Sequence, residues 1–360
     1  MAIVANYRYL QRLSGSAAVF PVVKADAYGH GAVPVARRLE QEGADRFAVA
    51  IAEEGVQLRR GGIRGEILLL NFSDPRDAPL HAAYGLTPTL YDLAQARDFA
   101  EATRGSEHPL RVHLKIDTGM GRLGLQPEEL PAAVELLQRA RGLFLAGTFT
   151  QLARADEPDG TATASQLVTL QRCLALLSAS GLDPGLVHAA NSAALLRHPS
   201  SILAAVRPGL AIYGIPPSET LDRGPLRPAM SVETEVLAVK NVPPGTPLGY
   251  GGRFVTARAS RIAALPIGYH DGVRRSFSNR VSVLMRGGRA PIVGAVSMDL
   301  TLVDATDSGA EPGDRVVLLG RDGNARITAW DLARAADTNP YEIVCGIGPR
   351  VPRVYASAGP

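Results

Sequence analysis

Lys24 follows an apolar run, residues 19–23, and precedes a glycine-bearing turn, in the segment VVKADAYGHG (residues 22–31). The run is rich in β-forming residues, so it predicts a buried strand with Lys24 at its carboxyl end. In parallel α/β folds catalytic groups collect at that end of the sheet. A partly desolvated lysine there is a nucleophile toward carbonyl groups, because burial favours its neutral amine. On residue types alone, the commoner alternative is a lysine that extends along the strand edge into solvent.

A second junction of strand and glycines lies at residues 115–124 (KIDTGMGRLG), which also fits the dinucleotide fingerprint GxGxxG. A dinucleotide site needs an acid at the end of the next strand, and that strand is expected to end at residues 147–150 (GTFT) without one. The side chain of Arg122 would crowd a pyrophosphate, whereas its planar guanidinium suits a substrate carboxylate. Carboxylate binding is therefore expected, and a nicotinamide oxidoreductase is the weaker alternative.

Two later segments carry groups that can hold a phosphate, namely residues 188–194 (HAANSAA) and 206–214 (VRPGLAIYG). Hydroxyl and backbone N–H groups in such turns bind phosphate oxygens. By residue type alone, Ser192 is more simply a helix N-cap and Arg207 a salt-bridged arginine at a strand start.

Taken in order, these segments resemble the alanine racemase family. Two further segments extend the resemblance, ALPIGYHDG (residues 264–272) and GAVSMD (residues 294–299). The resemblance runs from about residue 3 to 355, and these six ordered segments carry it. The resemblance implies a pyridoxal-phosphate enzyme that interconverts L- and D-alanine and supplies D-alanine for peptidoglycan. It also implies a homodimer with shared active sites.

The resemblance assigns a role to individual residues. A racemase removes a proton from one face of Cα and returns one to the other, so it needs two bases; these would be Lys24 and, from the partner subunit, Tyr269. Arg207 would keep the pyridine nitrogen unprotonated, which favours racemisation over transamination. The remaining assignments are cofactor contacts from Lys24, Tyr28, Ser192, Arg207, Gly209 and Leu210, substrate contacts from Arg122 and Met298, and a lysine that can be carbamylated, Lys115.

Three of these residues also have simpler explanations. Lys115 is equally consistent with a surface lysine at a strand end. Met298 is equally consistent with a buried core methionine. A lone tyrosine beside a glycine, such as Tyr269, is usually a packed turn residue.

The chain departs from the family at three places. Gln151 stands where the family usually has a histidine near Arg207, and glutamine does not titrate near neutral pH. Pro349 stands where some alanine racemases have a tyrosine that closes the pocket, so the site could admit serine. A serine or broad-specificity racemase is therefore an alternative. Family members also usually have a short strand before the segment that matches residues 3–7.

Composition limits the classes of function. The 360 residues are 46% hydrophobic and carry a net charge of +3 from 38 basic and 35 acidic residues, without long like-charge blocks, so neither nucleic-acid nor membrane binding is indicated. Cys173 and Cys345 lack CxxC spacing, which fits a reducing cytoplasm. No metal site is indicated, and a small-molecule enzyme is the expected class.

Two domains are expected. Residues 1–228 should form an α/β domain, an N-terminal (β/α)8 TIM-like barrel, because apolar runs alternate with helical patterns such as Val33 to Glu42 and Glu128 to Arg141. The expected barrel strands are Val19 to Val23, Arg46 to Ile51, Glu66 to Asn71, Arg111 to Ile116, Leu143 to Phe149, Leu186 to His188 and Ala211 to Tyr213.

A segment rich in proline and glycine, residues 214–228, marks the boundary. Residues 229–360 should form a mostly β domain that supplies the second base to the partner subunit. The expected strands there are Ser231 to Val239, Arg261 to Leu265, Val281 to Met285, Ala290 to Val296 and Arg315 to Leu319. A non-catalytic pyridoxal-phosphate carrier, the alternative from a different class, would lack this domain and its tyrosine.

Overall fold

The computed structural model describes residues 2–356. The chain divides into two compact units, Met1–Arg227 and Pro228–Pro360, called here the barrel unit and the β unit. Among the described residues, no helix is long and apolar enough to cross a membrane.

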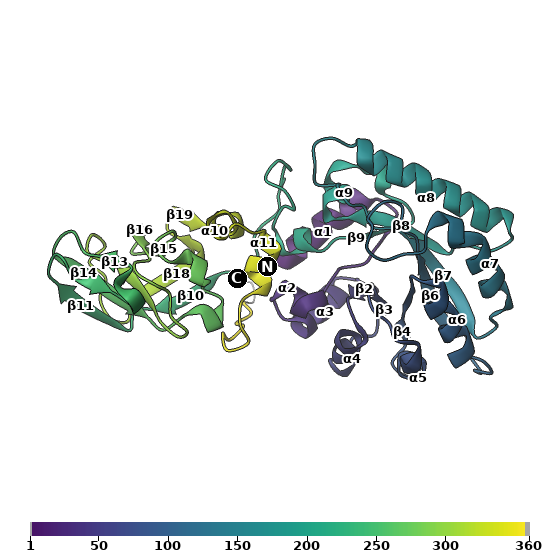
Figure 1. Cartoon of the computed structure of the whole chain (residues 1–360), viewed down its shortest axis with the longest axis horizontal. Helices are drawn as coiled ribbons and strands as arrows, with labels where there is room; N and C mark the ends of the chain where they lie inside the picture. The colour runs from purple at the N-terminus through teal and green to yellow at the C-terminus, as the bar shows by residue number, and fades with distance from the viewer. Residues whose placement is uncertain (1, 357–360) are drawn as a thin grey trace. The chain divides into compact units, whose positions relative to one another are not determined.

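Parallel strands form the centre of the barrel unit (Figure 1). They are β1 (Ala18–Val19), β2 (Arg46–Val49), β3 (Glu66–Leu69), β4 (Leu86–Thr87), β5 (Thr89–Leu90), β6 (Leu110–Lys115), β7 (Leu143–Phe149), β8 (Leu186–Asn191) and β9 (Ala205–Arg207). β4 and β5 are halves of one strand interrupted at Pro88: β4 pairs with β3 and β5 pairs with β6. β9 pairs with β1, and a bridge between Val22 and Ala48 joins the same segment to β2, which closes the ring. The expected eight-stranded barrel is confirmed.

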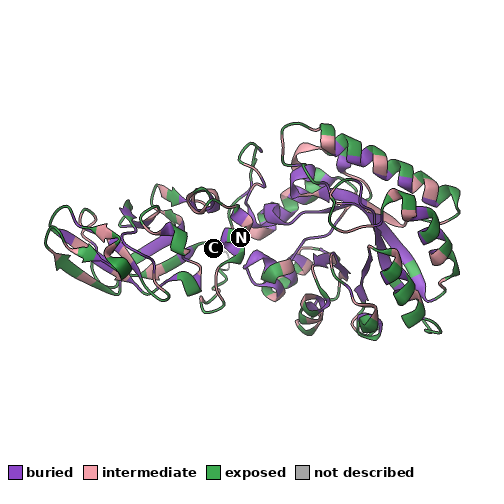
Figure 2. Cartoon of the chain, viewed as in Figure 1, coloured by how far each residue is buried: buried purple, intermediate pink, exposed green. Residues whose placement is uncertain are grey.

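Helices surround these strands. They are α1 (Ala2–Ser14), α3 (Ala32–Gln41), α4 (Ala52–Arg60), α5 (Ala78–Ala83), α6 (Leu93–Ala102), α7 (Leu130–Arg139), α8 (Thr161–Ala179) and α9 (Ser192–Arg197). In α3 the buried residues Val35, Ala36 and Leu39 recur at helical spacing, while Arg37 is exposed. Figure 2 shows the same contrast, with buried strands inside helices that are exposed on their outer faces.

Two of the expected barrel strands differ from the structure. The strand expected at 19–23 is only partly formed: β1 covers Ala18–Val19, Val22 makes an isolated bridge, and Val23 has a ψ of 19°. The segment also changes partner, because Phe20 N donates to Val206 O and Ala48 N donates to Pro21 O. The expected strand at 211–213 is wrong: Leu210–Tyr213 is a 3-10 helix, and the strand lies earlier, at β9. Pro208 has no N–H with which to continue the ladder beyond Arg207.

The β unit is built from antiparallel strands, as expected. They are β10 (Val232–Glu235), β11 (Ala238–Val242), β12 (Pro247–Leu248), β13 (Phe254–Val255), β14 (Ser260–Leu265), β15 (Ser282–Met285), β16 (Gly288–Pro291), β17 (Thr301–Asp304), β18 (Arg315–Asp322) and β19 (Ala325–Ile327), followed by α10 (Ala329–Ala336) and α11 (Pro340–Cys345). The expected strand at 231–239 is two strands in different sheets, because β10 pairs with β18 whereas β11 pairs with β14.

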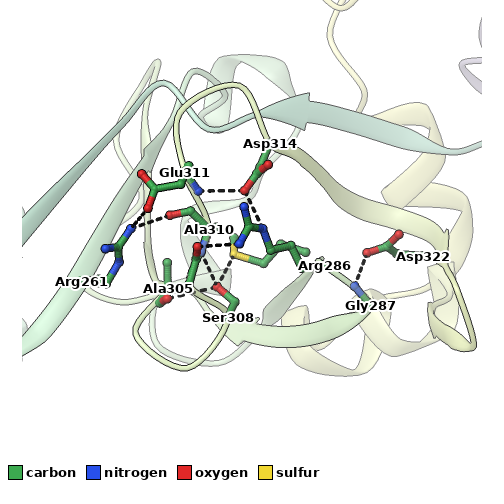
Figure 3. Close-up of polar contacts among 11 residues, drawn as sticks. Arg261, Arg286, Gly287, Ala305, Ser308, Ala310, Glu311, Asp314 and Asp322 are labelled. Carbon is green, nitrogen blue, oxygen red and sulfur yellow. Dashed lines mark hydrogen bonds and ion pairs between the residues drawn. The ribbon is translucent and has the colours of Figure 1, made fainter.

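Polar contacts fix the loop between β17 and β18 (Figure 3). Arg286 Nε lies 2.8 Å from Asp314 Oδ2, which also accepts a hydrogen bond from Glu311 N at 2.8 Å. Ser308 Oγ donates to Ala305 O at 3.1 Å. The Arg286–Asp314 ion pair connects the loop to the turn between β15 and β16.

Candidate active site

Lys24 begins a left-handed turn directly after the extended segment. Ala25, Asp26 and Ala27 have φ values of 51°, 51° and 54°, and Tyr28 has a φ of 54°. For residues other than glycine this conformation costs roughly 1–2 kcal/mol each. The turn lies at the carboxyl end of the barrel strands, where part of the lysine is accessible and part is buried.

Two carboxylates hold this turn. Glu54 Oε1 accepts from Ala25 N at 2.7 Å, and Glu54 Oε2 accepts from Ala50 N at 2.7 Å, so one side chain connects the lysine loop to the end of β2. Asp26 Oδ1 accepts from Ala32 N at 2.7 Å. These charge-assisted bonds offset part of the conformational cost and fix the backbone that carries Lys24.

Lys115 ends β6 and is almost fully buried, at 3% exposure, so the explanation as a surface lysine is wrong. Its Nζ lies 5.5 Å from the centre of the Phe149 ring and 3.5 Å from Leu70 O. Burial lowers the pKa of Lys115 to about 8. The nearby cations of Arg207, Arg122 and Lys24 act in the same direction.

Asp117 shapes the glycine-rich turn that carries Arg122. Its Oδ1 accepts from Gly119 N, Met120 N and Gly121 N at 2.9, 2.8 and 3.2 Å. Burial acts to raise the pKa of Asp117, but these N–H groups outweigh it and hold the pKa below its usual value. Because the carboxylate occupies these three amides, they are not available to a pyrophosphate. The turn is therefore no dinucleotide site, and it leaves Arg122 exposed.

A polar cup forms where β8 and β9 end. Ser192 Oγ accepts from Gly209 N at 2.8 Å and from Ala211 N at 3.3 Å. The N-cap of α9 is Asn191, so the explanation of Ser192 as a helix cap is wrong. A Cβ at residue 209 would lie 2.5 Å from the hydroxyl oxygen of Tyr28, so only glycine leaves room for that hydroxyl.

Arg207 ends β9 and is 3% exposed, without a carboxylate partner among the described residues. Nη2 donates to Thr150 O at 2.7 Å and Ala189 O at 3.2 Å, and Nη1 lies 2.5 Å from His188 Nδ1. The guanidinium lies 4.9 Å from the centre of the Phe149 ring. Burial lowers the pKa of Arg207 to about 9, which leaves it protonated at neutral pH.

Gln151 occupies the position beside this guanidinium. Its Oε1 accepts from Arg207 Nη2 at 3.3 Å, and Gln166 Nε2 donates to its main-chain oxygen at 3.0 Å. The amide thus keeps an acceptor next to Arg207 without a group that titrates near neutral pH.

The β unit contains the other two expected site residues, which are neighbours. Tyr269 N donates to Ser297 O at 2.9 Å, and His270 N donates to Met298 O at 3.1 Å. Tyr269 is 44% exposed and Met298 is 52% exposed, so neither is a core residue. Arg350 Nε binds Asp271 Oδ1 at 2.7 Å, which fixes the segment around the exposed Pro349 to the same surface.

Several residues of the site were not assigned roles from the sequence. Asp117, Phe149, Glu54 and His113 all contact or support the expected residues. Asp117 and Phe149 lie within or beside recognisable segments, so their position could have identified them. Glu54 lies on another element, and no local pattern indicates it.

The residues of the barrel unit fit pyridoxal phosphate. Ser192 and Tyr28 supply hydroxyl groups that can donate to a phosphate beside Gly209. The amides of Gly209 and Ala211 donate to Ser192 Oγ, which leaves the Ser192 O–H to act as a donor. Lys24 can hold an aldehyde, and the buried cation of Arg207 can face a ring nitrogen. No group of His, Cys, Asp and Glu among residues 2–356 could hold a metal ion. The fold and this site define a class, the cofactor-dependent α/β-barrel enzymes with an appended β domain.

Comparison with known proteins identifies the family. The domain described as "Alanine racemase, N-terminal domain" matches residues 1–217, and "Alanine racemase, C-terminal domain" matches residues 229–355. The chain belongs to the alanine racemase family. This family is pyridoxal-phosphate-dependent, and its members are isomerases. The resemblance inferred from the sequence is confirmed.

Similar proteins cover nearly the whole chain. The alanine racemase of Symbiobacterium thermophilum is 46% identical over 98% of this chain and 94% of its own length. Alanine racemase from Bacillus anthracis, solved with bound L-Ala-P, superposes with a TM-score of 0.95 at 36% identity, covering 100% of this chain and 94% of that one. Alanine racemase from Bartonella henselae, with covalently bound pyridoxal phosphate, gives a TM-score of 0.90 at 32% identity, covering 99% of this chain and 97% of that one.

Proposed function

We propose that this chain is a pyridoxal-phosphate-dependent racemase that interconverts L- and D-alanine. The observation that carries the proposal is that Lys24, Arg122 and Arg207 all lie close enough to Lys115 to act on its charge, in a barrel of the alanine racemase family. Relatives at 46% and 43% identity are alanine racemases. D-alanine for peptidoglycan and a cytoplasmic location are the physiological part of the proposal.

Three cationic residues of the barrel unit have defined tasks in this proposal. When bound, pyridoxal phosphate withdraws electrons and so acidifies the Cα proton of the amino acid. Lys24 holds the cofactor and exchanges a proton on one face of Cα. Arg122 would orient the substrate carboxylate, and the positive charge of Arg207, placed near the ring nitrogen, would keep that nitrogen unprotonated.

Tyr269 exchanges the proton on the other face in this proposal. Its hydroxyl is on the β unit, and it would reach the reaction from the partner subunit of a homodimer. The exposure of Tyr269 and Met298 supports this, because exposed apolar groups that lie together mark interaction surfaces. Met298 would then border the space for the substrate side chain.

Lys115 carries a carbamate in this proposal. Carbamylation requires the neutral amine, and the lowered pKa of Lys115, about 8, makes that form available near neutral pH. A carbamate would place a negative charge among three cations and so orient Arg122.

Turnover of both alanine and serine tests the proposal. Purified protein with cofactor should form D-alanine from L-alanine, with a kcat/KM for L-alanine well above that for L-serine. Equal or reversed values would favour the serine or broad-specificity racemase that Pro349 suggests. A bound cofactor without turnover of either amino acid would indicate a carrier protein.

A further inference from the structure

A line of polar side chains crosses the interior of the barrel. Glu66 begins β3, His113 lies within β6, His188 lies within β8, and Arg207 ends β9. Both imidazoles are fully buried, whereas the Glu66 side chain is 21% exposed. Barrel interiors are usually filled by apolar side chains, so a polar line through this one needs a reason.

The distances between the side chains join these four residues into one row of polar contacts, called here the hydrogen-bond chain. Arg207 Nη1 lies 2.5 Å from His188 Nδ1, and His188 Nε2 lies 2.9 Å from His113 Nδ1. His113 Nε2 and Glu66 Oε1 face each other at 3.7 Å. Neither of these two atoms has a hydrogen-bond partner among the described residues, so a closer approach would satisfy both at once.

The direction of every hydrogen bond follows from the chemistry of the groups. Arginine only donates, so His188 Nδ1 accepts and the proton of His188 is on Nε2. His188 therefore donates to His113 Nδ1, and the proton of His113 is also on Nε2. That proton points at the Glu66 carboxylate. A protonated imidazole at either position would place two donors against each other.

Aromatic rings and a glycine shape the space around the two imidazoles. Phe149 stacks on His188 at a centroid distance of 4.7 Å, and Phe20 packs against both imidazoles. A Cβ at Gly147 would lie 2.6 Å from His113 Cε1, so the glycine makes room for the ring. The register of the pairing between β6 and β7 shifts between Val112 and His113, next to this ring.

Electrostatics agree with neutral imidazoles. Burial, together with the cation of Arg207, holds the pKa of His188 well below its usual value. Burial lowers the pKa of His113 as well, against the opposite effect of Glu66. Arg111 and Arg46 also act on this end of the chain, where Arg46 Nε lies 3.6 Å from Glu66 Oε2.

We propose that Glu66 and His113 are positioning residues that act through His188 on Arg207. Arg207 requires an acceptor at His188 Nδ1 from one end, and the carboxylate holds the Nε2 proton of His113 from the other. Only when both ends act are the two rings held in one orientation, so that His188 presents an acceptor that orients the guanidinium and stabilises its charge. The role of Arg207 at the cofactor ring rests on the proposed function, whereas the direction of the hydrogen bonds between Arg207, His188 and His113 does not.

A magic-angle-spinning 15N NMR spectrum of the holoenzyme, labelled at histidine, tests the hydrogen-bond chain directly. His188 and His113 should both show unprotonated Nδ1 and protonated Nε2, without titration between about pH 6 and 8. Glu66→Met should let the two rings reorient, give mixed tautomers at His188 and lower kcat about tenfold with little change in KM, because it removes the carboxylate that faces the Nε2 proton of His113. Glu66→Gln keeps an acceptor and should restore the tautomers and most of kcat.

Glu40→Met is the matched control. Glu40 Oε1 accepts from Arg64 N and Gly65 N at 2.8 and 2.9 Å, so it supports the start of β3 without belonging to the chain. This variant should leave the tautomers of His188 unchanged. The proposal would be overturned if His188 is doubly protonated or carries its proton on Nδ1. It would also be overturned if Glu66→Met and Glu40→Met change the tautomers of His188 equally. If the tautomers are as expected but the holoenzyme has no turnover, only the proposed function is contradicted.

Discussion

Positive charge dominates the side chains of the candidate site. Lys24, Arg122 and Arg207 all act on Lys115, and Asp117, whose charge opposes them, already accepts three amide hydrogen bonds. Lys115 and Arg207 are buried, and burying cations without compensating anions is costly. A phosphate, a substrate carboxylate and a carbamate would each supply negative charge, so the site is most stable when it holds these groups.

Carbamylation of Lys115 should depend on pH. As pH falls below the pKa of about 8, the amine becomes protonated and can no longer hold CO2, so the carbamate is lost. The 13C NMR signal of protein equilibrated with labelled bicarbonate should therefore weaken from pH 9 to pH 6, in the range set by this pKa of about 8. Lys115→Met should lack the signal and raise KM for alanine. A signal that persists in this variant would show that another amine is carbamylated.

The replacement Gln151→His should change the pH profile more than the chemistry. An imidazole beside the Arg207 cation would titrate below its ordinary pKa of about 6.5, so a new ionisation should appear on the acid side of kcat/KM. The profile of D-alanine formation from about pH 5 to 9 measures this. An unchanged profile with unchanged activity would show that Gln151 has no influence on the site.

At the scale of elements, the lysine-bearing turn depends on contacts that are distant in sequence. Four consecutive residues, 25–28, have positive φ, and Glu54 connects this turn to Ala50 through two backbone bonds. The local cost is roughly 1–2 kcal/mol per residue. The turn is therefore maintained by α4 and the end of β2 rather than by its own sequence.

Glu54→Ala should lower the free energy of unfolding of the barrel unit by about 2 kcal/mol, because it leaves two backbone donors without their charged acceptor. Urea denaturation of the whole chain measures this change. Glu53→Ala is the control, since Glu53 is an exposed neighbour on the same helix. Equal stability of the two variants would show that Glu54 does not hold the turn.

The sequence predicted strand ends better than loop conformations. Lys115 ends β6 as predicted, because an apolar run that meets a glycine-bearing segment is a strong local signal. The strand expected at 19–23 is shorter, Ala18–Val19, so Lys24 follows an isolated bridge at Val22 rather than a strand end. The strand expected at 211–213 was wrong because an apolar run of this length is also compatible with a buried 3-10 helix. Neither the left-handed turn nor the bond from Glu54 has a local signal, since both depend on tertiary contacts.

At the scale of the whole molecule, the proposed bases belong to different units. Lys24 is in the barrel unit and Tyr269 in the β unit, beside Met298. If the partner subunit supplies Tyr269, then each active site contains residues of two chains, and activity requires the dimer.

Mixing two inactive variants tests this arrangement. Lys24→Ala and Tyr269→Phe should each be inactive alone, but exchanged subunits should recover about a quarter of wild-type activity, because half of the dimers then hold one intact site of two. The rate of D-alanine formation after mixing measures the recovery. No recovery, with subunit exchange shown by native mass spectrometry, would place both bases in one chain.

The most direct test of the central claim is a single experiment on Lys24. The visible absorption of bound cofactor, its change on borohydride reduction and the formation of D-alanine are measured for the wild-type protein and Lys24→Ala. The account predicts a reducible yellow chromophore with turnover in the wild type and the loss of both in the variant. A wild-type protein without the chromophore, or a variant that retains turnover, would contradict the assignment of Lys24.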